Sequence, residues 1–330
     1  MNLEKIFKMQ AAQLKKALHD ELARLGYDVN IIHEKAQFLY AEGTAPFMLV
    51  AHLDTVHKDA PEIICYSADG NFIMSPQGIG GDDRCGVYII LSLIEKLSFK
   101  PYILFTMGEE TGGIGASAFA TYITANDRQP ELKYIIEFDR NGHQDCVFYR
   151  CDNQDFVKFV ESFGFKKAYG TFSDISIIAP RMKVAAVNLS SGYANAHTQH
   201  EYVSVKVMNK TIERAERMLN AECEKFEWKE VSYQKYNTNN YYQQKSACSY
   251  TQVIASPVPA KTVIVKTYLG CHENWFSEIY IDEAGNYYKR SAYGDFDLFN
   301  DVFPIDDTNP PEYDESQAKA LSVFSYGNTY

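Results

Sequence analysis

Apolar residues recur at helical spacing in several segments of the chain. In the first 25 residues they are Ile6, Met9, Leu14, Leu18 and Leu22. Because these side chains alternate with lysines and acids, residues 1–25 are expected to form one amphipathic helix. The same spacing predicts helices through Val87–Leu97 and Val205–Leu219, and weaker patterns predict helices at 113–126 and 155–164.

Short apolar runs lie between these helices. They are Pro46–Ala51, Pro101–Met107, Leu132–Asp139, Cys146–Cys151 and Val184–Leu189. Runs of this length with flanking turn residues predict strands, and alternation of strands with helices is typical of βαβ units. The pattern therefore predicts an α/β protein with a largely parallel sheet.

The pattern changes near Trp228. Residues 231–260 are rich in Tyr, Asn, Gln and Ser, a composition typical of a linker or covering segment. Strands are predicted beyond it at Thr262–Tyr268, Phe276–Asp282 and Tyr287–Ala292, the last two joined by a hairpin loop at 283–286. We therefore expect a main domain at 1–228, a linker at 229–261 and a small β-rich C-terminal region at 262–330 with a poorly ordered tail.

Composition narrows the classes of function. The formal net charge is −11 over 330 residues, which argues against nucleic acid as a partner because such binding depends on clustered Lys and Arg. No stretch is apolar enough to span a bilayer, and the N-terminus lacks a secretory signal. The seven cysteines have no scaffold-like spacing and are interpreted as reduced thiols. The expected location is the cytoplasm.

Five polar clusters stand where predicted strands end or helices begin. They are "AHLDTVH" (51–57), "GIGGDDRCG" (78–86), "FTMGEETGG" (105–113), "IIEFDR" (135–140) and "NAHTQHEY" (195–202). Each alone has an ordinary structural explanation, such as acids at a helix N-terminus or surface histidines. Since ligands collect at the carboxyl ends of parallel strands, the clusters together predict a site. Two histidines and at least three carboxylates suit two divalent metals that share a carboxylate.

The order of the motifs adds a family resemblance. H-x-D, G-G-D-D-x-x-G, G-E-E-x-G, a strand-end F-D and A-H-x-x-x-E follow one another. In this order they resemble the co-catalytic dizinc exopeptidases of clan MH, which include leucyl aminopeptidases, tripeptidases and metal carboxypeptidases. The resemblance covers roughly residues 1–225. It implies a three-layer α/β/α sandwich around a central mixed, mostly parallel sheet.

The resemblance also implies a role for individual residues. The implied metal ligands are His52, Asp82, Glu110, Asp139 and His197, with Asp82 as the bridge. Asp54 would orient the imidazole of His52 from behind, and Glu109 would be the general base. Asp83 is expected to be a neighbour of the bridge, not a ligand. His57 and His200 receive no role and are expected at the surface or rim.

These roles lead to a predicted activity. The resemblance implies hydrolysis of an amide bond by a metal-bridging water, with Glu109 as the general base. It also implies two divalent ions, which are zinc in the family, with manganese or cobalt as alternatives. Dizinc carboxypeptidases and tripeptidases usually carry a lid domain between the positions of Asp139 and His197. The 57 residues numbered 140–196 leave no room for one. This favours an aminopeptidase acting on small peptides.

Besides a structural protein whose acids and histidines are only solvated, two alternatives stay open on the sequence alone. One is an N-acyl amino acid amidohydrolase, or carboxypeptidase-like deacylase, with the same site, so that the substrate is either a small peptide or an N-acyl amino acid. The other is a non-catalytic binding module on the same fold, against which the retention of Glu109 counts. The oligomeric state and the role of residues 231–330 do not follow from the sequence.

Overall fold

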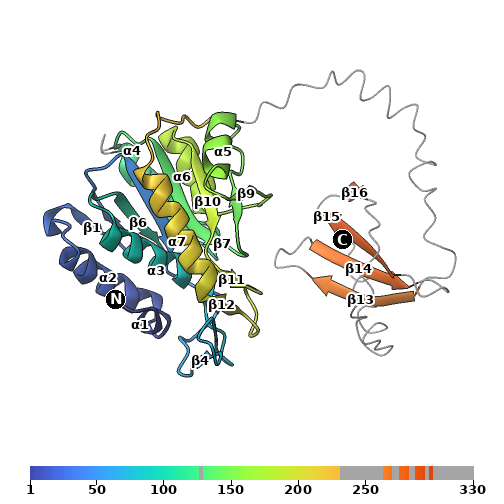
Figure 1. The fold of residues 1–330 in the computed structure, drawn as a ribbon. Coiled ribbons are helices and arrows are strands. Elements are labelled where there is room, and N and C mark those ends of the chain that lie inside the picture. Colours follow the sequence, from blue (N-terminus) through green and yellow to red (C-terminus); the bar gives the residue numbers. More distant parts are fainter. Residues whose placement is uncertain (126–128, 231–262, 270–274, 282–286, 294–296, 300–330) are drawn as a thin grey trace, which may run out of the picture. The chain divides into compact units, whose positions relative to one another are not determined.

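The computed structural model describes residues 1–125 and 129–230 and four strand segments at 263–269, 275–281, 287–293 and 297–299 (Figure 1). The chain forms two compact units, Met1–Tyr233 and Gln234–Tyr330. Each unit is described by itself. The predicted domain boundaries at residues 228 and 261 stay a prediction.

The first unit is built on an eight-stranded mixed sheet with the order β1-β2-β6-β3-β7-β10-β8-β9. Its strands are β1 (Ile32–Glu34), β2 (Phe38–Ala41), β3 (Phe47–His52), β6 (Tyr102–Thr106), β7 (Tyr134–Arg140), β8 (Asp145–Val147), β9 (Lys166–Lys167) and β10 (Ala186–Ser190). The central strands β6, β3, β7 and β10 run parallel to one another. β2 and β8 flank them in antiparallel orientation. The five strands predicted in this region are confirmed within a few residues, although the last part of the predicted strand Cys146–Cys151 lies beyond β8.

Helices cover both faces of this sheet. They are α1 (Leu3–Phe7), α2 (Ala11–Arg24), α3 (Gly81–Lys96), α4 (Ile114–Ala125), α5 (Gln154–Glu161), α6 (Asp174–Met182) and α7 (Val205–Asn220), with a 3-10 turn, η1, at Val29–Ile31. The apolar side chains of α4 and α6 pack in one core cluster, while those of the other helices pack in the cluster on the opposite face. The predicted three-layer α/β/α sandwich is confirmed.

Strand β3 illustrates why the core has two halves. Every residue of this strand is buried, and consecutive side chains alternate between the two sides of a strand. Leu49 and Ala51 belong to the cluster that contains α3 and α7, whereas Met48 and Val50 belong to the one that contains α4 and α6. A continuous apolar run is therefore what a strand covered on both faces requires.

The N-terminal segment differs from its prediction. One helix is expected over residues 1–25, but α1 ends at Phe7 and α2 begins at Ala11. Gln10 has an extended backbone (φ −65°, ψ 151°) and closes a capping box with Gln13, which satisfies N–H groups at the start of α2. At the end of α1, the guanidinium of Arg84 donates to the carbonyl of Ile6 at 3.3 Å. Local capping and this distant donor together replace the hydrogen bonds lost at the break.

A small second sheet lies in the same unit. It has the order β11-β12-β5-β4, with β4 (Cys65–Tyr66), β5 (Phe72–Met74), β11 (Tyr193–Ala194) and β12 (Tyr202–Ser204). β11 and β12 pair antiparallel, so the segment between them is anchored at both ends. The motif that contains His197 occupies this segment, and its position is therefore set by a hairpin.

The second unit contains a four-stranded antiparallel sheet of β13 (Val263–Leu269), β14 (Trp275–Ile281), β15 (Tyr287–Tyr293) and β16 (Asp297–Phe299). The three strands predicted here are confirmed, and β16 is additional. The predicted linker beyond residue 230 and the hairpin loop at 283–286 lie outside the described residues. Within the described part of the chain, no helix is long and apolar enough to cross a membrane.

Candidate metal centre

The predicted site residues gather at one edge of the large sheet. His52 is the last residue of β3 and Asp139 is the penultimate residue of β7. Glu110 follows β6, and Asp82 lies in the first turn of α3. His197 lies between β11 and β12. This edge holds the carboxyl ends of the parallel strands, where α/β folds place their ligand sites.

The two oxygens of Asp82 face two different pairs of side chains. Its Oδ1 lies 3.0 Å from Nε2 of His52, and the same nitrogen lies 3.4 Å from Oδ1 of Asp139. Its Oδ2 lies 3.2 Å from Nε2 of His197, and that nitrogen lies 3.0 Å from Oε2 of Glu110. Asp82 is thus shared by a His52–Asp139 pair and a His197–Glu110 pair.

The donor set fits divalent cations. His52, Asp82 and Glu110 each place one possible ligand atom within 4.8 Å of those of the other two. Oε1 of Glu110 is buried and has no hydrogen-bond partner within the described structure. Carboxylates this close repel one another unless a cation stands among them. Imidazole nitrogen with carboxylate oxygen is the donor combination of catalytic zinc sites.

Asp83 lies beside this set, and its oxygens are held by the backbone. A second possible group combines it with His52 and Asp139. Oδ2 of Asp83 accepts from the backbone N–H of His52 at 3.3 Å, and Oδ1 accepts from that of Gly86 at 3.0 Å. These bonds tie the end of β3 to the start of α3. They favour the predicted neighbour role over a ligand role.

Asp54 holds the loop that carries the two glutamates. Its carboxylate accepts from the backbone N–H groups of Gly108, Glu109 and Glu110 at 2.8, 3.4 and 3.2 Å. Its Oδ1 also lies 3.6 Å from Nδ1 of His52. Burial would raise the pKa of Asp54, but the hydrogen bond and charge of His52 and the N–H of Gly108 lower it to about 2. Nδ1 of His52 also lies 3.1 Å from the backbone carbonyl oxygen of Asp54. Asp54 can therefore orient this imidazole through its main chain as well as its carboxylate, and it also fixes the following loop.

A polar layer lies behind Asp139. The side-chain amide of Asn188 accepts from the backbone N–H of Asp139 at 2.8 Å and donates to its carbonyl at 2.9 Å. The hydroxyl of Tyr193 donates to Oδ1 of Asp139 at 3.2 Å. Ser173 and Thr106 donate to the buried carboxylates of Glu137 and Asp174, respectively. Ser173 and Asp174 thus support the strands behind the site.

Two further histidines differ in their surroundings. The side chain of His57 is 14% exposed and lines a small pocket, and its Nε2 lies 3.3 Å from Oε2 of Glu201. His200 is exposed, as expected. Spacing alone could not separate the two, because the partner of His57 is 144 positions away.

Burial and the crowding of carboxylates shift the pKa values of the residues in this centre. Burial, and then the charge of Asp82, raise the pKa of Asp139 to about 7. Burial, with smaller contributions from Asp139, Asp174 and Asp82, raises the pKa of Glu109 to about 9, against the opposing effect of His52. Burial would lower the pKa of His52, but the charge of Asp139 together with hydrogen bonds to Asp139, Asp54 and Asp82 raises this pKa well above its usual value. The cluster therefore attracts positive charge in either form, proton or metal.

We expect the metal-free protein to lose stability as the pH rises from about 4 to about 7. The folded protein holds a proton on Asp139 up to a pH near 7, whereas an unfolded Asp loses it near pH 4. The contribution of Asp139 to the stability of the folded state is thus complete below about pH 4 and is lost as the pH rises toward 7. The raised pKa of His52 changes the stability in the same direction. Thermal unfolding of chelator-treated protein measures this effect. Added metal should flatten the dependence, and a melting temperature that rises with pH would contradict the account.

Comparison with known proteins identifies the type of site. Residues 36–154 match the model described as peptidase family M28. This range contains the motifs of His52, Asp82, Glu109–Glu110 and Asp139. Residues 36–154 are thus similar to the M28 metallopeptidases. The predicted relationship to metal-dependent exopeptidases, and the predicted class of metal-dependent hydrolase acting on peptide bonds, are confirmed.

Solved structures with the same fold carry similar descriptions. The chain is similar to an aminopeptidase PepT from Bacillus cereus ATCC 10987, with 16% identity, a TM-score of 0.52, and coverage of 66% of this chain and 96% of that chain. It is also similar to a tripeptidase from Staphylococcus aureus subsp. aureus Mu50, with 13% identity, a TM-score of 0.53, and coverage of 66% and 95%. At these identities the likeness supports the fold. No curated protein sequence matches the chain.

Proposed function

We propose that this metallo-exopeptidase is a dinuclear aminopeptidase that cleaves small peptides. Two divalent ions, zinc in the first instance, would be held by His52 with Asp139 and by His197 with Glu110, with Asp82 between them. The observation that carries the proposal is that each oxygen of Asp82 faces a separate His–carboxylate pair. A shared carboxylate of this kind suits a two-metal hydrolase.

The chain's own residues have distinct tasks in this reaction. Bound divalent metals supply a lowered pKa for water and polarisation of the scissile carbonyl. Glu109 accepts the proton of the attacking water on its carboxylate and passes it to the departing amine. Asp54 keeps Glu109 and Glu110 in place through the N–H groups of their loop. Tyr193 fixes the carboxylate of Asp139 through its hydroxyl.

The charge of the centre favours a substrate with a free amine. Carboxylates dominate the site, and such a surface attracts a cationic α-amino group. Arg140, the cation next to Asp139 in the sequence, has its Nε 3.8 Å from the carboxylate of Asp145. This ion pair leaves Arg140 less suited to bind the carboxylate of an N-acyl amino acid. The aminopeptidase proposal is therefore preferred to the deacylase.

The test combines metal analysis with a substrate panel. Purified protein is analysed by plasma mass spectrometry, and the same samples are assayed with aminoacyl and N-acyl chromogenic amides. We expect about two zinc ions per chain and cleavage only of the free-amine substrates. Cleavage of the N-acyl substrates alone would replace the proposal by the deacylase. Absence of metal and activity after reconstitution with zinc, manganese or cobalt would overturn both.

A further inference from the structure

Glu201 is a buried carboxylate that the reaction does not use. It is 1% exposed and belongs to the same segment as His197. Its Oε1 accepts from the backbone N–H of Asp82 at 2.9 Å. Its Oε2 accepts from the backbone N–H of Gly80 at 2.9 Å and lies 3.3 Å from Nε2 of His57. Both oxygens are thus directed at the loop of the bridging residue.

We propose that His57 and Glu201 are a pair of positioning residues that fix the bridging carboxylate of Asp82. The inference rests on the proposed dinuclear function, because it concerns the geometry of the shared ligand. Glu201 holds the main chain on both sides of Gly81, and His57 holds Glu201. Neither residue needs to touch substrate to have this effect.

The backbone of the loop is shaped around these two side chains. Gly78 and Gly80 have positive φ angles of 84° and 65°, a region that favours glycine. A Cβ at Gly78 would lie 2.2 Å from Cε1 of His57, and one at Gly81 would lie 3.2 Å from Oε1 of Glu201. The main chain at Gly78 therefore approaches His57 more closely than a residue with a Cβ would allow, and the main chain at Gly81 lies in tight contact with Glu201.

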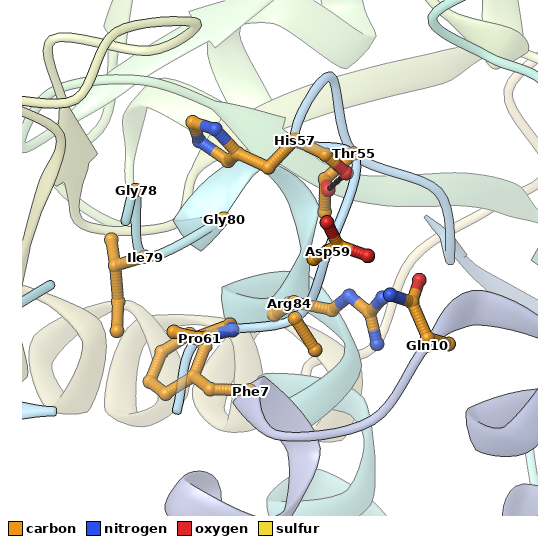
Figure 2. A pocket seen from close by; sticks show the side chains of 11 residues that line it. Phe7, Gln10, Thr55, His57, Asp59, Pro61, Gly78, Ile79, Gly80 and Arg84 are labelled. Carbon is orange, nitrogen blue, oxygen red and sulfur yellow. Dashed lines mark hydrogen bonds between the residues drawn. The ribbon is translucent and has the colours of Figure 1, made fainter. Parts of the chain in front are cut away.

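Figure 2 places the His57 ring at this contact. The side chain extends from the segment that follows β3 toward Gly78 and Gly80, while Arg84 lies on the far side of the small pocket that these residues line. His57 thus comes from the chain segment of His52 and Asp54, whereas Glu201 comes from that of His197. The pair connects the segments that supply the two histidine ligands.

The contact between His57 and Glu201 should strengthen metal binding, because it restricts the position of Asp82. A carboxylate accepting two backbone N–H bonds can still rotate or shift, and the bond from His57 restricts Oε2 of Glu201. Because ligand geometry depends on such outer partners, losing one typically weakens metal binding by about 10- to 100-fold. We expect that loss here, since a displaced Asp82 would misplace a ligand of both metals.

The experiment compares three substitutions in the full chain. His57→Ala removes the donor, and His57→Gln restores an amide N–H at nearly the distance of Nε2 from the backbone. His200→Ala is the matched control, because His200 is exposed and immediately precedes Glu201. Zinc affinity is measured by chelator competition, together with thermal unfolding of the metal-free proteins and the kcat and KM of peptide hydrolysis.

We expect His57→Ala to weaken zinc binding by about 10- to 100-fold and to lower kcat more than KM changes. His57→Gln should recover most of the affinity, and His200→Ala should match the wild type. A role confined to stability would lower the melting temperature of His57→Ala without changing zinc affinity, and this result would overturn the inference. If His57→Ala does not fold, His57→Asn, whose amide is too short to reach Glu201, takes its place.

A second variant tests whether the two residues act together. If they do, Glu201→Gln and the double variant His57→Ala/Glu201→Gln should show similar zinc affinities, because the second change removes an interaction already lost. Additive losses would contradict the pairing. Failure of the wild type to bind zinc would instead refute the proposed function, so the two failures can be told apart.

Discussion

Replacing Glu109 by glutamine is expected to lower kcat by about 10²- to 10⁴-fold while the protein keeps its metal and its fold. The amide has nearly the volume of the carboxylate but cannot accept a proton from the attacking water. The loop should not move, because it is held through the backbone by Asp54. Steady-state kinetics, metal content and thermal unfolding of the same preparation measure the three parts of this prediction.

Glu110→Gln is the matched control, because the two glutamates are adjacent and their loop is held by the same residue. Oε2 of Glu110 lies 3.0 Å from Nε2 of His197, so loss of its charge should weaken metal binding, whereas Glu109→Gln should not. In the metal-free protein, Glu109→Gln should also reduce the loss of stability at rising pH, since it removes a carboxyl group whose pKa is raised to about 9. Activity of Glu109→Gln within a few-fold of wild type would refute its role as base.

Much of the fold could be predicted because the central strands carry a local signal. β3, β6 and β7 are buried on both faces, and this burial requires the continuous apolar runs that the sequence displays. β1 and β2 were not predicted. They are three and four residues long, and β2 depends on its pairing with β6, more than sixty positions away. Strands stabilised by distant partners leave little local pattern.

The candidate site was predictable for a different reason. Strand order in an α/β fold brings the carboxyl ends of parallel strands together, so motifs after β3, β6 and β7 had to converge. The contacts made by side chains to distant backbone could not be inferred in this way. Asp54 holds the loop at 108–110, and Glu201 holds the backbone of Asp82, across 54 to 119 positions. Such contacts follow from the packed structure and have no fixed spacing in the sequence.

Asp82→Asn is expected to reduce metal content from about two ions to less than one per chain. An asparagine keeps the volume of the side chain but has no negative charge and one acceptor oxygen in place of two. It therefore cannot serve the His52–Asp139 pair and the His197–Glu110 pair at once. Loss of a residue that only orients a metal ligand typically weakens metal binding by about 10- to 100-fold. Loss of the shared ligand itself should therefore weaken metal binding by more than this. Metal analysis after gel filtration measures the result.

The neighbouring substitution Asp83→Asn provides the decisive contrast, because it makes the same chemical change one position away. The carboxylate of Asp83 accepts from the backbone N–H groups of His52 and Gly86, and an amide would place its own N–H₂ group against one of them. This buried mismatch should lower the free energy of unfolding by about 1–3 kcal/mol, yet leave two metals bound. If Asp83→Asn lost the metals and Asp82→Asn kept them, the bridge would be Asp83. The group of His52, Asp83 and Asp139 would then be the one that binds metal.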